Sequence, residues 1–172
     1  MTKSNLADLS WQLLTALDHV HRNKICHRDV KPDNIIIRSR GESTNNKYSE
    51  TTESGFNLTL IDFNVAVSTH GGPIDGDFGV KEWSAPETRS KSTYSEVSDM
   101  WSYACVLFFM YTGGQEMFEG GPIQETIEQK LGNLGKLTVA SGVKLTRNEI
   151  GCLRDLLGNL FQINPDKRLT SA

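Results

Sequence analysis

A dense run of polar side chains, HRDVKPDN at residues 27–34, is the part of the sequence best suited to chemistry. Five of its eight residues are charged or carry a side-chain amide. Such groups are costly to bury without partners, so the run must either face solvent or surround a charged ligand. Pro32 stiffens the run because its ring fixes the backbone angle φ. Residues 27–34 are therefore the first candidate for a binding or catalytic loop.

The segments on either side of this run are predicted to hold it in place. Residues 5–23 carry apolar side chains at helical spacing, which predicts one amphipathic helix before the run. After the run, residues 35–38 and 57–61 are rich in apolar side chains and are predicted to pair as a β-hairpin. Residues 39–55, between these strands, contain hardly an apolar side chain. They are predicted to form a flexible surface insert, and a docking or phosphorylation role for it is the less favoured alternative.

The second half of the chain is predicted to supply a helical core. Apolar residues crowd every side of residues 97–112, which is typical of a buried helix. Glycines and a proline between residues 113 and 122 predict a break, and Thr146 with Glu149 three residues later has the spacing of a helix-capping box. The buried face of that last helix is predicted to be Ile150, Leu153, Leu157 and Leu160. We expect a mainly α fold of one domain, with a small β-hairpin.

Composition excludes several classes of partner. A net charge of -3 leaves no broad basic surface, so we expect no nucleic-acid binding. Three cysteines without CxxC spacing suit reduced thiols, which indicates an intracellular, cytoplasmic protein. The most apolar run, residues 103–111, is far shorter than the ~20 residues of a membrane span, so it is predicted to be a buried helix.

The run HRDVKPDN resembles the catalytic loop of eukaryotic protein kinases. Three further segments fit the family in order, namely LIDFNVA at 60–66, GVKEWSAPE at 79–87 and INPDKRLT at 163–170. A lysine at position 31 favours the serine/threonine class. The resemblance implies a protein-kinase-like C-terminal helical lobe whose hairpin carries the catalytic and metal-binding loops. It also implies ATP and Mg²⁺ as cofactors and a protein as substrate.

The resemblance gives each residue of the predicted site a role. Asp29 would orient the attacking hydroxyl and accept its proton, and Lys31 would neutralise charge near the transferred phosphate. Asn34 and Asp62 would supply the hard oxygen ligands that Mg²⁺ prefers. Ile36 would form the apolar floor beneath the adenine. Lys31, Asn34, Ile36 and Asp62 are thus the expected ATP-binding residues.

A second triplet competes with Asp62 for the metal. Asp77, Phe78 and Gly79 spell the DFG motif of kinases, whereas Asp62 and Phe63 are followed by asparagine. In the family the metal-binding aspartate follows the second strand of the hairpin, and only Asp62 does so. The approach to Asp77 is rich in glycine, which predicts a loop. We therefore expect Asp62, and not Asp77, to hold the metal.

Supporting contacts are implied by the same resemblance. Glu87 and Arg168 are expected to form a buried ion pair, and Asp99 is expected to hydrogen-bond the backbone of the catalytic loop. His27 and Phe63 are expected to stack beneath the site, with His27 in a packing role. The other histidines, His19, His21 and His70, receive no predicted role.

Two departures from the family bear on the site. Asn64 replaces the glycine of DFG, and asparagine tolerates the left-handed backbone that such a turn uses. Val80 replaces a threonine whose hydroxyl bridges the catalytic aspartate and lysine, so we expect slower catalysis.

Arg28 pairs with an activation-loop phosphate in many members of the family. Asp75 or Asp77 would replace that phosphate here, although two solvated aspartates are the favoured alternative.

The resemblance covers only half of a kinase domain. Nothing before residue 27 resembles the glycine-rich phosphate loop, the strand lysine or its partner glutamate. We therefore expect residues 1–172 to be a C-terminal lobe fragment without the N-terminal ATP-binding lobe, nearly inactive alone. The alternative is a truncated kinase or pseudokinase lobe that acts as a protein-binding scaffold. The intact run at 27–34 favours the enzyme.

Overall fold

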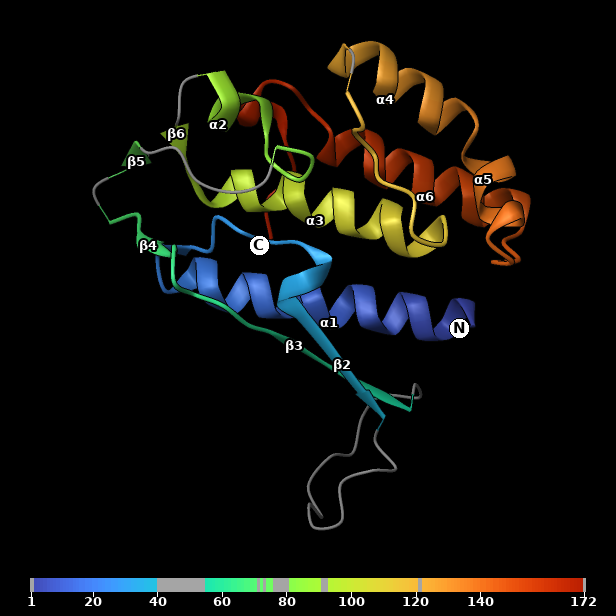
Figure 1. The fold of residues 1–172 in the computed structure, drawn as a ribbon, viewed down its shortest axis with the longest axis horizontal. Helices are drawn as coiled ribbons and strands as arrows, with labels where there is room; N and C mark the ends of the chain where they lie inside the picture. The colour runs from blue at the N-terminus through green and yellow to red at the C-terminus, as the bar shows by residue number, and fades with distance from the viewer. Residues whose placement is uncertain are drawn as a thin grey trace.

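The computed structural model describes residues 2–39, 55–70, 72, 74–75, 81–90, 93–120 and 122–171. Within these ranges there are six α-helices, two 3-10 helices and three two-stranded antiparallel sheets (Figure 1). The helices are α1 (Lys3–Arg22), η1 (Pro32–Asn34), α2 (Pro86–Ser90), α3 (Glu96–Tyr111), α4 (Ile123–Gly132), α5 (Leu134–Ala140), α6 (Arg147–Leu160) and η3 (Pro165–Lys167). The strands are β1 (Ile25–Cys26), β2 (Ile35–Ser39), β3 (Phe56–Leu60), β4 (Val67–Ser68), β5 (Ile74–Asp75) and β6 (Thr93–Tyr94).

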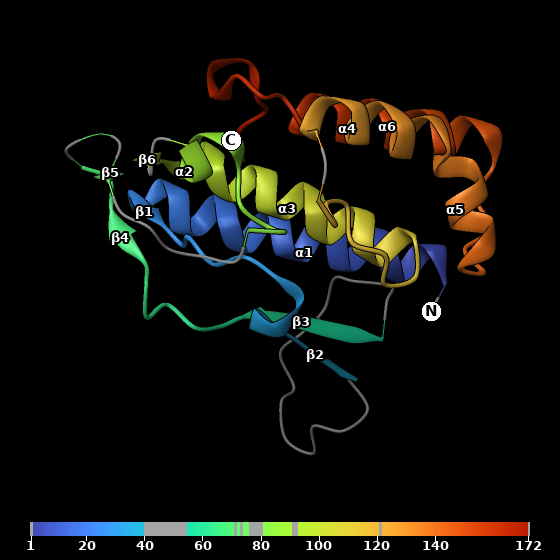
Figure 2. The ribbon, with the colours of Figure 1, turned by 45° about the horizontal axis from the view of Figure 1, so that its top comes forward.

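Helix α3 is the centre of the fold, with α1 packed on one side and α6 on the other (Figure 1, Figure 2). Every residue from 98 to 108 is buried. The Trp101 ring stacks on Phe118 at 5.3 Å between centroids and meets Phe161 edge-on at 5.1 Å. The prediction of a helix buried on most sides is confirmed, and apolar packing around it forms the single core cluster of the described residues.

Helix α1 covers one face of α3 and begins two residues earlier than predicted. Thr2 caps it, because the Thr2 hydroxyl accepts a hydrogen bond of 3.2 Å from the Asn5 amide. The predicted apolar stripe is buried throughout, at Leu6, Leu9, Leu13, Leu17 and Val20. The helix ends at Arg22, and Lys24, two residues later, takes a positive φ of 56° and turns the chain into β1.

The predicted hairpin forms from β2 and β3, in antiparallel register from Ile35 opposite Leu60 to Ser39 opposite Phe56. It packs on α1, on the side away from α6 and α4 (Figure 2). Gln12 of α1 ties the two elements together, because its side chain donates to the Phe56 carbonyl (3.1 Å) and accepts from the Leu58 amide (2.8 Å). The predicted insert falls mostly on residues 40–54, which lie outside the described residues.

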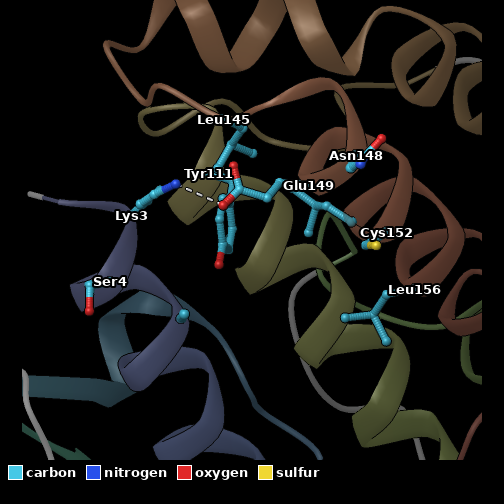
Figure 3. Close-up of a pocket in the computed structure, with 10 residues that line it drawn as sticks. Lys3, Ser4, Tyr111, Leu145, Asn148, Glu149, Cys152 and Leu156 are labelled. Carbon is cyan, nitrogen blue, oxygen red and sulfur yellow. Dashed lines mark hydrogen bonds and ion pairs between the residues drawn. The ribbon is translucent and has the colours of Figure 1, made fainter.

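Helix α6 begins at the predicted capping box. The Glu149 amide donates to the Thr146 hydroxyl (3.3 Å), and the Thr146 amide donates to Glu149 Oε2 (2.7 Å). The same carboxylate receives Lys3 Nζ of α1 at 2.8 Å (Figure 3). Glu149 therefore both caps α6 and joins it to the start of the chain.

The helical packing between α3 and α6 was only partly predicted. The described residues between 113 and 122 form no helix, as expected, but α4 and α5 follow them and were not predicted. Both pack on α6. Three of the four residues expected on the buried face of α6 are buried, Leu153, Leu157 and Leu160, while Ile150 is only half-buried.

The mainly helical class is thus confirmed, with the strands confined to two-stranded ribbons. No helix in the described part of the chain is long and apolar enough to cross a membrane.

Candidate active site

Two side chains of the polar run, those of Lys31 and Asn34, converge on the Asp29 carboxylate. Lys31 Nζ lies 3.0 Å from Asp29 Oδ1 and 2.8 Å from Oδ2. Asn34 Nδ2 donates to Asp29 Oδ2 (2.8 Å) and to the Asp29 carbonyl (2.7 Å). The Asp29 and Lys31 side chains are 16% and 19% exposed, so the ion pair remains open to a ligand. The run is therefore neither a fully solvated loop nor a buried one.

The backbone of this run is fixed by Asp99, in the first turn of α3. The buried Asp99 carboxylate accepts the His27 amide (2.7 Å) at Oδ2 and the Arg28 amide (2.9 Å) at Oδ1. Arg28 has a positive φ of 67°, a left-handed conformation that costs energy in a residue with a Cβ. The expected contact of Asp99 with the loop backbone is confirmed, and it holds the strained peptide just before Asp29.

His27 has a packing and hydrogen-bonding role. Its ring is fully buried and meets Phe63 edge-on at 4.6 Å, which confirms the expected contact between them. Its Nε2 lies 3.0 Å from the Ile61 carbonyl, and its Nδ1 lies 3.3 Å from the Asp29 amide. The carbonyl can only accept and the amide can only donate, so His27 is protonated on Nε2 and accepts at Nδ1.

Asp62 lies two residues after the end of β3, beside the start of β2. The Ile61 amide donates to the Asn34 carbonyl at 2.9 Å, so the backbones that carry Asn34 and Asp62 are joined. Asp62 is exposed, and its Oδ1 accepts a hydrogen bond of 3.3 Å from the Asn64 amide. The left-handed residue of this turn is Asp62, at φ 65°, and not Asn64. The turn survives with Asn64 in place of glycine, as expected, but it does not place Asn64 in the left-handed region.

The residues present fit a magnesium site of the kind completed by phosphate. No three acidic, histidine or cysteine side chains cluster among the described residues, so no all-protein metal cage is present there. Mg²⁺ is usually bound by one or two protein ligands together with water and substrate phosphates. Asp62 offers an exposed carboxylate. The Asn34 side chain commits its Nδ2 to Asp29, which leaves its Oδ1 for a ligand.

Ile36 lies in the second position of β2, opposite Thr59. Successive side chains of a strand point to opposite faces. Its neighbour Ile35 packs against the core, so Ile36 projects from the other face of the hairpin, where it is half-buried. All five predicted site residues are thus described and lie on one loop and one hairpin.

Other predictions about the site have mixed outcomes. Asp77 to Val80 lie outside the described residues, so the competing DFG triplet and the threonine replacement stay untested. Arg28 donates from Nε to the Val65 carbonyl, and its guanidinium lies 5.5 Å from the Tyr94 ring centroid. Asp75 accepts from the Thr93 hydroxyl at 3.4 Å, and not from Arg28. For Asp75 the proposed replacement of an activation-loop phosphate is not seen.

Cys26, one residue before the run, is an inert position. The thiol is fully buried and lies 3.2 Å from the Ser95 carbonyl. Burial raises the pKa of the Cys26 thiol far above its ordinary range, and the nearby Asp99 carboxylate raises it further. The thiolate needed for redox chemistry is therefore disfavoured, in keeping with the expected structural role.

One residue of this network, His21, was not predicted from the sequence. It contacts Asp99 from the last turn of α1, with its Nε2 3.0 Å from Asp99 Oδ2. The two residues are 78 positions apart, and neither helical spacing nor the kinase motifs connect them.

Comparison with known proteins agrees with this geometry. A family model described as the protein kinase domain matches residues 1–172. Mouse sperm motility kinase 2B is 32% identical over 163 residues, which cover 94% of this chain and 29% of the relative. Serine/threonine-protein kinase cds1 of Schizosaccharomyces pombe is 32% identical over 169 residues, with 94% and 32% covered. Bovine serine/threonine-protein kinase 33 is 28% identical over 163 residues, with 92% and 31% covered.

The chain therefore spans less than a third of the length of these relatives. The family model covers all of it, and the named relatives include serine/threonine kinases. The chain belongs to the protein kinase domain family, and the relatives that it resembles include serine/threonine kinases.

Proposed function

We propose that residues 1–172 form the C-terminal lobe of a serine/threonine protein kinase, which transfers phosphate from ATP to serine or threonine hydroxyls of a protein. The observation that supports this most strongly is the Asp29 carboxylate, held by Lys31 and Asn34 and mounted on a peptide fixed by Asp99. Phosphoryl transfer depends on such positioning of a carboxylate and a cation around the reacting groups.

Asp29 would act as the proton acceptor. Its Oδ2 receives both Lys31 and Asn34 at 2.8 Å, whereas Oδ1 receives only Lys31, at 3.0 Å. Oδ1 is therefore the oxygen that would orient the substrate hydroxyl and take its proton. Lys31 pairs with this carboxylate in the resting site and can turn its ammonium group toward a transferred phosphate.

Asn34 and Asp62 would hold the metal. When bound, Mg²⁺ with ATP supplies the phosphoryl group and neutralises its developing charge. Asn34 then has two functions, because its Nδ2 orients Asp29 while its Oδ1 would bind the metal. Ile36, on the outer face of the hairpin, would contact the adenine.

An apolar groove supports the proposal that a second lobe completes the site. The groove lies between α1 and β3 and has a volume of about 660 Å³. Trp11 and Phe63, which line it, are 65% and 45% exposed. Large exposed aromatic side chains beside an apolar groove are typical of a surface that another part of a protein covers. Because the present residues supply only the floor and the metal side of a nucleotide site, we expect this chain alone to bind Mg²⁺ and ATP weakly.

The test is a substitution in a protein that carries this chain behind an intact N-terminal lobe, from the parent gene or as a chimera with a relative. Asp29→Asn removes the proton acceptor while keeping the shape, and should lower kcat by about 10²-fold or more. Asp155→Asn, on the exposed side of α6, is the matched control and should leave kcat unchanged. Transfer that survives Asp29→Asn at more than half the wild-type rate would refute the proposed function.

The same groove favours a second candidate, a scaffold that binds another protein through Trp11 and Phe63. A scaffold would bind its partner equally well with Asp29→Asn and would lose binding with Trp11→Ala. The kinase would lose turnover with Asp29→Asn. These two substitutions therefore separate the candidates.

A further inference from the structure

His21 joins three distant parts of the chain. It lies in the last turn of α1 and is 7% exposed, and both nitrogens of its ring have partners. Nε2 lies 3.0 Å from Asp99 Oδ2, and Nδ1 lies 2.8 Å from the hydroxyl of Ser171. Ser171 is 150 residues away in sequence, in the segment that follows η3. The ring therefore connects the C-terminal segment to the carboxylate that holds the catalytic loop.

The chemistry of the side chains in the series Ser171–His21–Asp99 determines which group donates each hydrogen bond. Asp99 already receives two backbone amides, and an ionised carboxylate can only accept, so His21 donates from Nε2. In the neutral ring, Nδ1 must then accept the hydroxyl proton of Ser171. A serine hydroxyl can also accept, so the contact survives if the ring is protonated. Ser171 thus fixes the orientation of the ring in either state.

The contact with Asp99 falls at a sensitive place. Asp99 Oδ2 is shared by His21 and the amide of His27, while Oδ1 holds the amide of Arg28. Arg28 is in the left-handed conformation, which persists only where its surroundings enforce it. A rotation of the Asp99 carboxylate would weaken both amide contacts at once. Asp29 is the next residue, so its position depends on the same peptide.

The outer end of the series is accessible. A cavity of about 300 Å³ beside α1 is lined by His21 and Ser171, together with Arg22 and Lys24. Asp99, by contrast, is only 1% exposed and does not line this cavity. The Ser171 hydroxyl is therefore the member through which the C-terminal segment can influence the loop.

We propose that His21 is a positioning residue for Asp29, held in place by Ser171 and acting through Asp99. The inference rests on the proposed function only in that Asp29 is taken as the catalytic carboxylate. His21 itself touches neither substrate nor cofactor. Its effect should therefore appear in kcat and in the exchange of the His27 and Arg28 amides, with little change in the KM for ATP.

Two variants with an amide side chain, His21→Gln and His21→Asn, distinguish the contact of the ring with Asp99 from its contact with Ser171. The side-chain nitrogen of His21→Gln reaches the place of Nε2, so it keeps a donor for Asp99. The shorter His21→Asn reaches only the place of Nδ1, so it keeps a group for Ser171 and loses the contact with Asp99. The two side chains differ by one methylene and have the same polarity, so each is the control for the other. Ser171→Ala removes the outer contact alone.

The first readout is amide hydrogen exchange on the 172-residue chain, which needs no activity. His21→Asn should speed exchange of the His27 and Arg28 amides by about tenfold, the effect expected for loss of a hydrogen bond to a charged group. His21→Gln should stay within about twofold of wild type, and Ser171→Ala should fall between. Amides in the middle of α3 and α6 should be unchanged, which shows that the fold persists. Equal rates at these amides in the Gln and Asn variants would overturn the proposal.

The second readout is kcat in the protein with its N-terminal lobe. His21→Asn should lower kcat by about tenfold at constant KM for ATP, and His21→Gln should retain it. A kcat for His21→Asn equal to that for His21→Gln would overturn the proposal. If instead Asp29→Asn leaves transfer intact, the proposed function fails, while amide exchange still decides the role of His21.

Discussion

Arg168 and Glu87, 81 residues apart, meet in a two-point ion pair, with Nη1 2.6 Å from Oε1 and Nη2 2.9 Å from Oε2. Arg168 is only 4% exposed, and it also donates to the carbonyls of Val97 (2.8 Å) and Gln162 (3.1 Å). Its guanidinium lies 5.1 Å from the ring centroid of Trp101. The pair predicted from the sequence is therefore confirmed, and one side chain joins α2, α3 and the segment after α6.

Removal of one partner of this pair should destabilise the fold strongly. Arg168→Met leaves the Glu87 carboxylate without its cation in a poorly solvated place, which should lower the free energy of unfolding by about 3–5 kcal/mol. Urea unfolding of the 172-residue chain measures this. The control is Arg22→Met, which breaks an exposed pair with Asp18 and should cost less than about 1 kcal/mol. Equal losses for the two variants would contradict the role of the buried pair.

The choice of Asp62 over Asp77 gives a second prediction. In a protein with its N-terminal lobe, Asp62→Asn should lower kcat by about 10²-fold and raise the Mg²⁺ concentration needed for half-maximal activity, because it removes a charged metal ligand. Asp77→Asn should leave both values unchanged. The opposite result, with Asp77 essential and Asp62 dispensable, would mean that the alignment of the two DFG-like segments is wrong.

The elements that the sequence predicted well are those with local signals. The apolar stripe of α1, the capping box at Thr146 and the two apolar segments of the hairpin each lie within a few residues of one another. Helices α4 and α5 lack such signals, because α4 buries only Ile127 and Leu131 and no side chain caps its start at Pro122. A short helix of that kind is stabilised by packing on its neighbours, which local periodicity does not reveal.

The candidate active site shows the same contrast between residues with a local sequence signal and residues without one. Asp29, Lys31 and Asn34 are close in sequence, so a short motif was enough to group them. The contacts made by Asp99 and Arg168 could be predicted only from the resemblance to the kinase family. Neither the short motif nor the family resemblance identified a role for His21. A histidine in the last turn of a helix fits the surface pattern of basic residues at that end. Its partners are fixed by the fold alone.

Helix α6 offers a matched pair of neighbouring leucines for a third prediction. Leu157 is fully buried in the core, whereas Leu156 is 39% exposed. Leu157→Ala should lower the free energy of unfolding by about 2–5 kcal/mol, because it removes buried methyl groups and leaves a cavity. Leu156→Ala should cost far less. The two free energies come from urea unfolding at one temperature, and similar losses for both would mean that α6 is docked in another orientation.

The three cysteines should differ sharply in reactivity. Cys26 and Cys105 are buried, and burial raises the pKa of each thiol well above its ordinary range. Cys152 is exposed, on the wall of a cavity of about 440 Å³ between α1 and α6 (Figure 3). A thiol reagent at pH 8 should therefore modify one thiol rapidly in the folded chain and all three in denaturant. Cys152→Ser should remove the rapid phase, and a rapid phase that remains would contradict the burial of Cys26 or Cys105.

Glu149 should titrate far below the ordinary range of a glutamate. Lys3 donates to its carboxylate at 2.8 Å, and the amide and hydroxyl of Thr146 add to the effect, so the pKa of Glu149 is lowered from 4.5 to about 2. A depressed pKa means that the folded state favours the ionised carboxylate. Its contribution to stability is complete above about pH 4.5 and is lost as the pH falls toward about 2.

Carboxyl ¹³C NMR across pH 1.5 to 6 tests this directly, because that range includes both the lowered pKa of Glu149 and the ordinary glutamate pKa of about 4.3. The Glu149 signal should titrate near pH 2 in the wild type and move upward with Lys3→Met, because the main cause of the shift is then removed. Lys144→Met, an exposed lysine near the start of α6, is the control and should not move it. The midpoint of urea unfolding should also depend less on pH between 4.5 and 2 when Glu149 is replaced by Gln. A wild-type signal that titrates near its ordinary value, or one that ignores Lys3→Met, would show that the contact between α1 and α6 in Figure 3 does not form in solution.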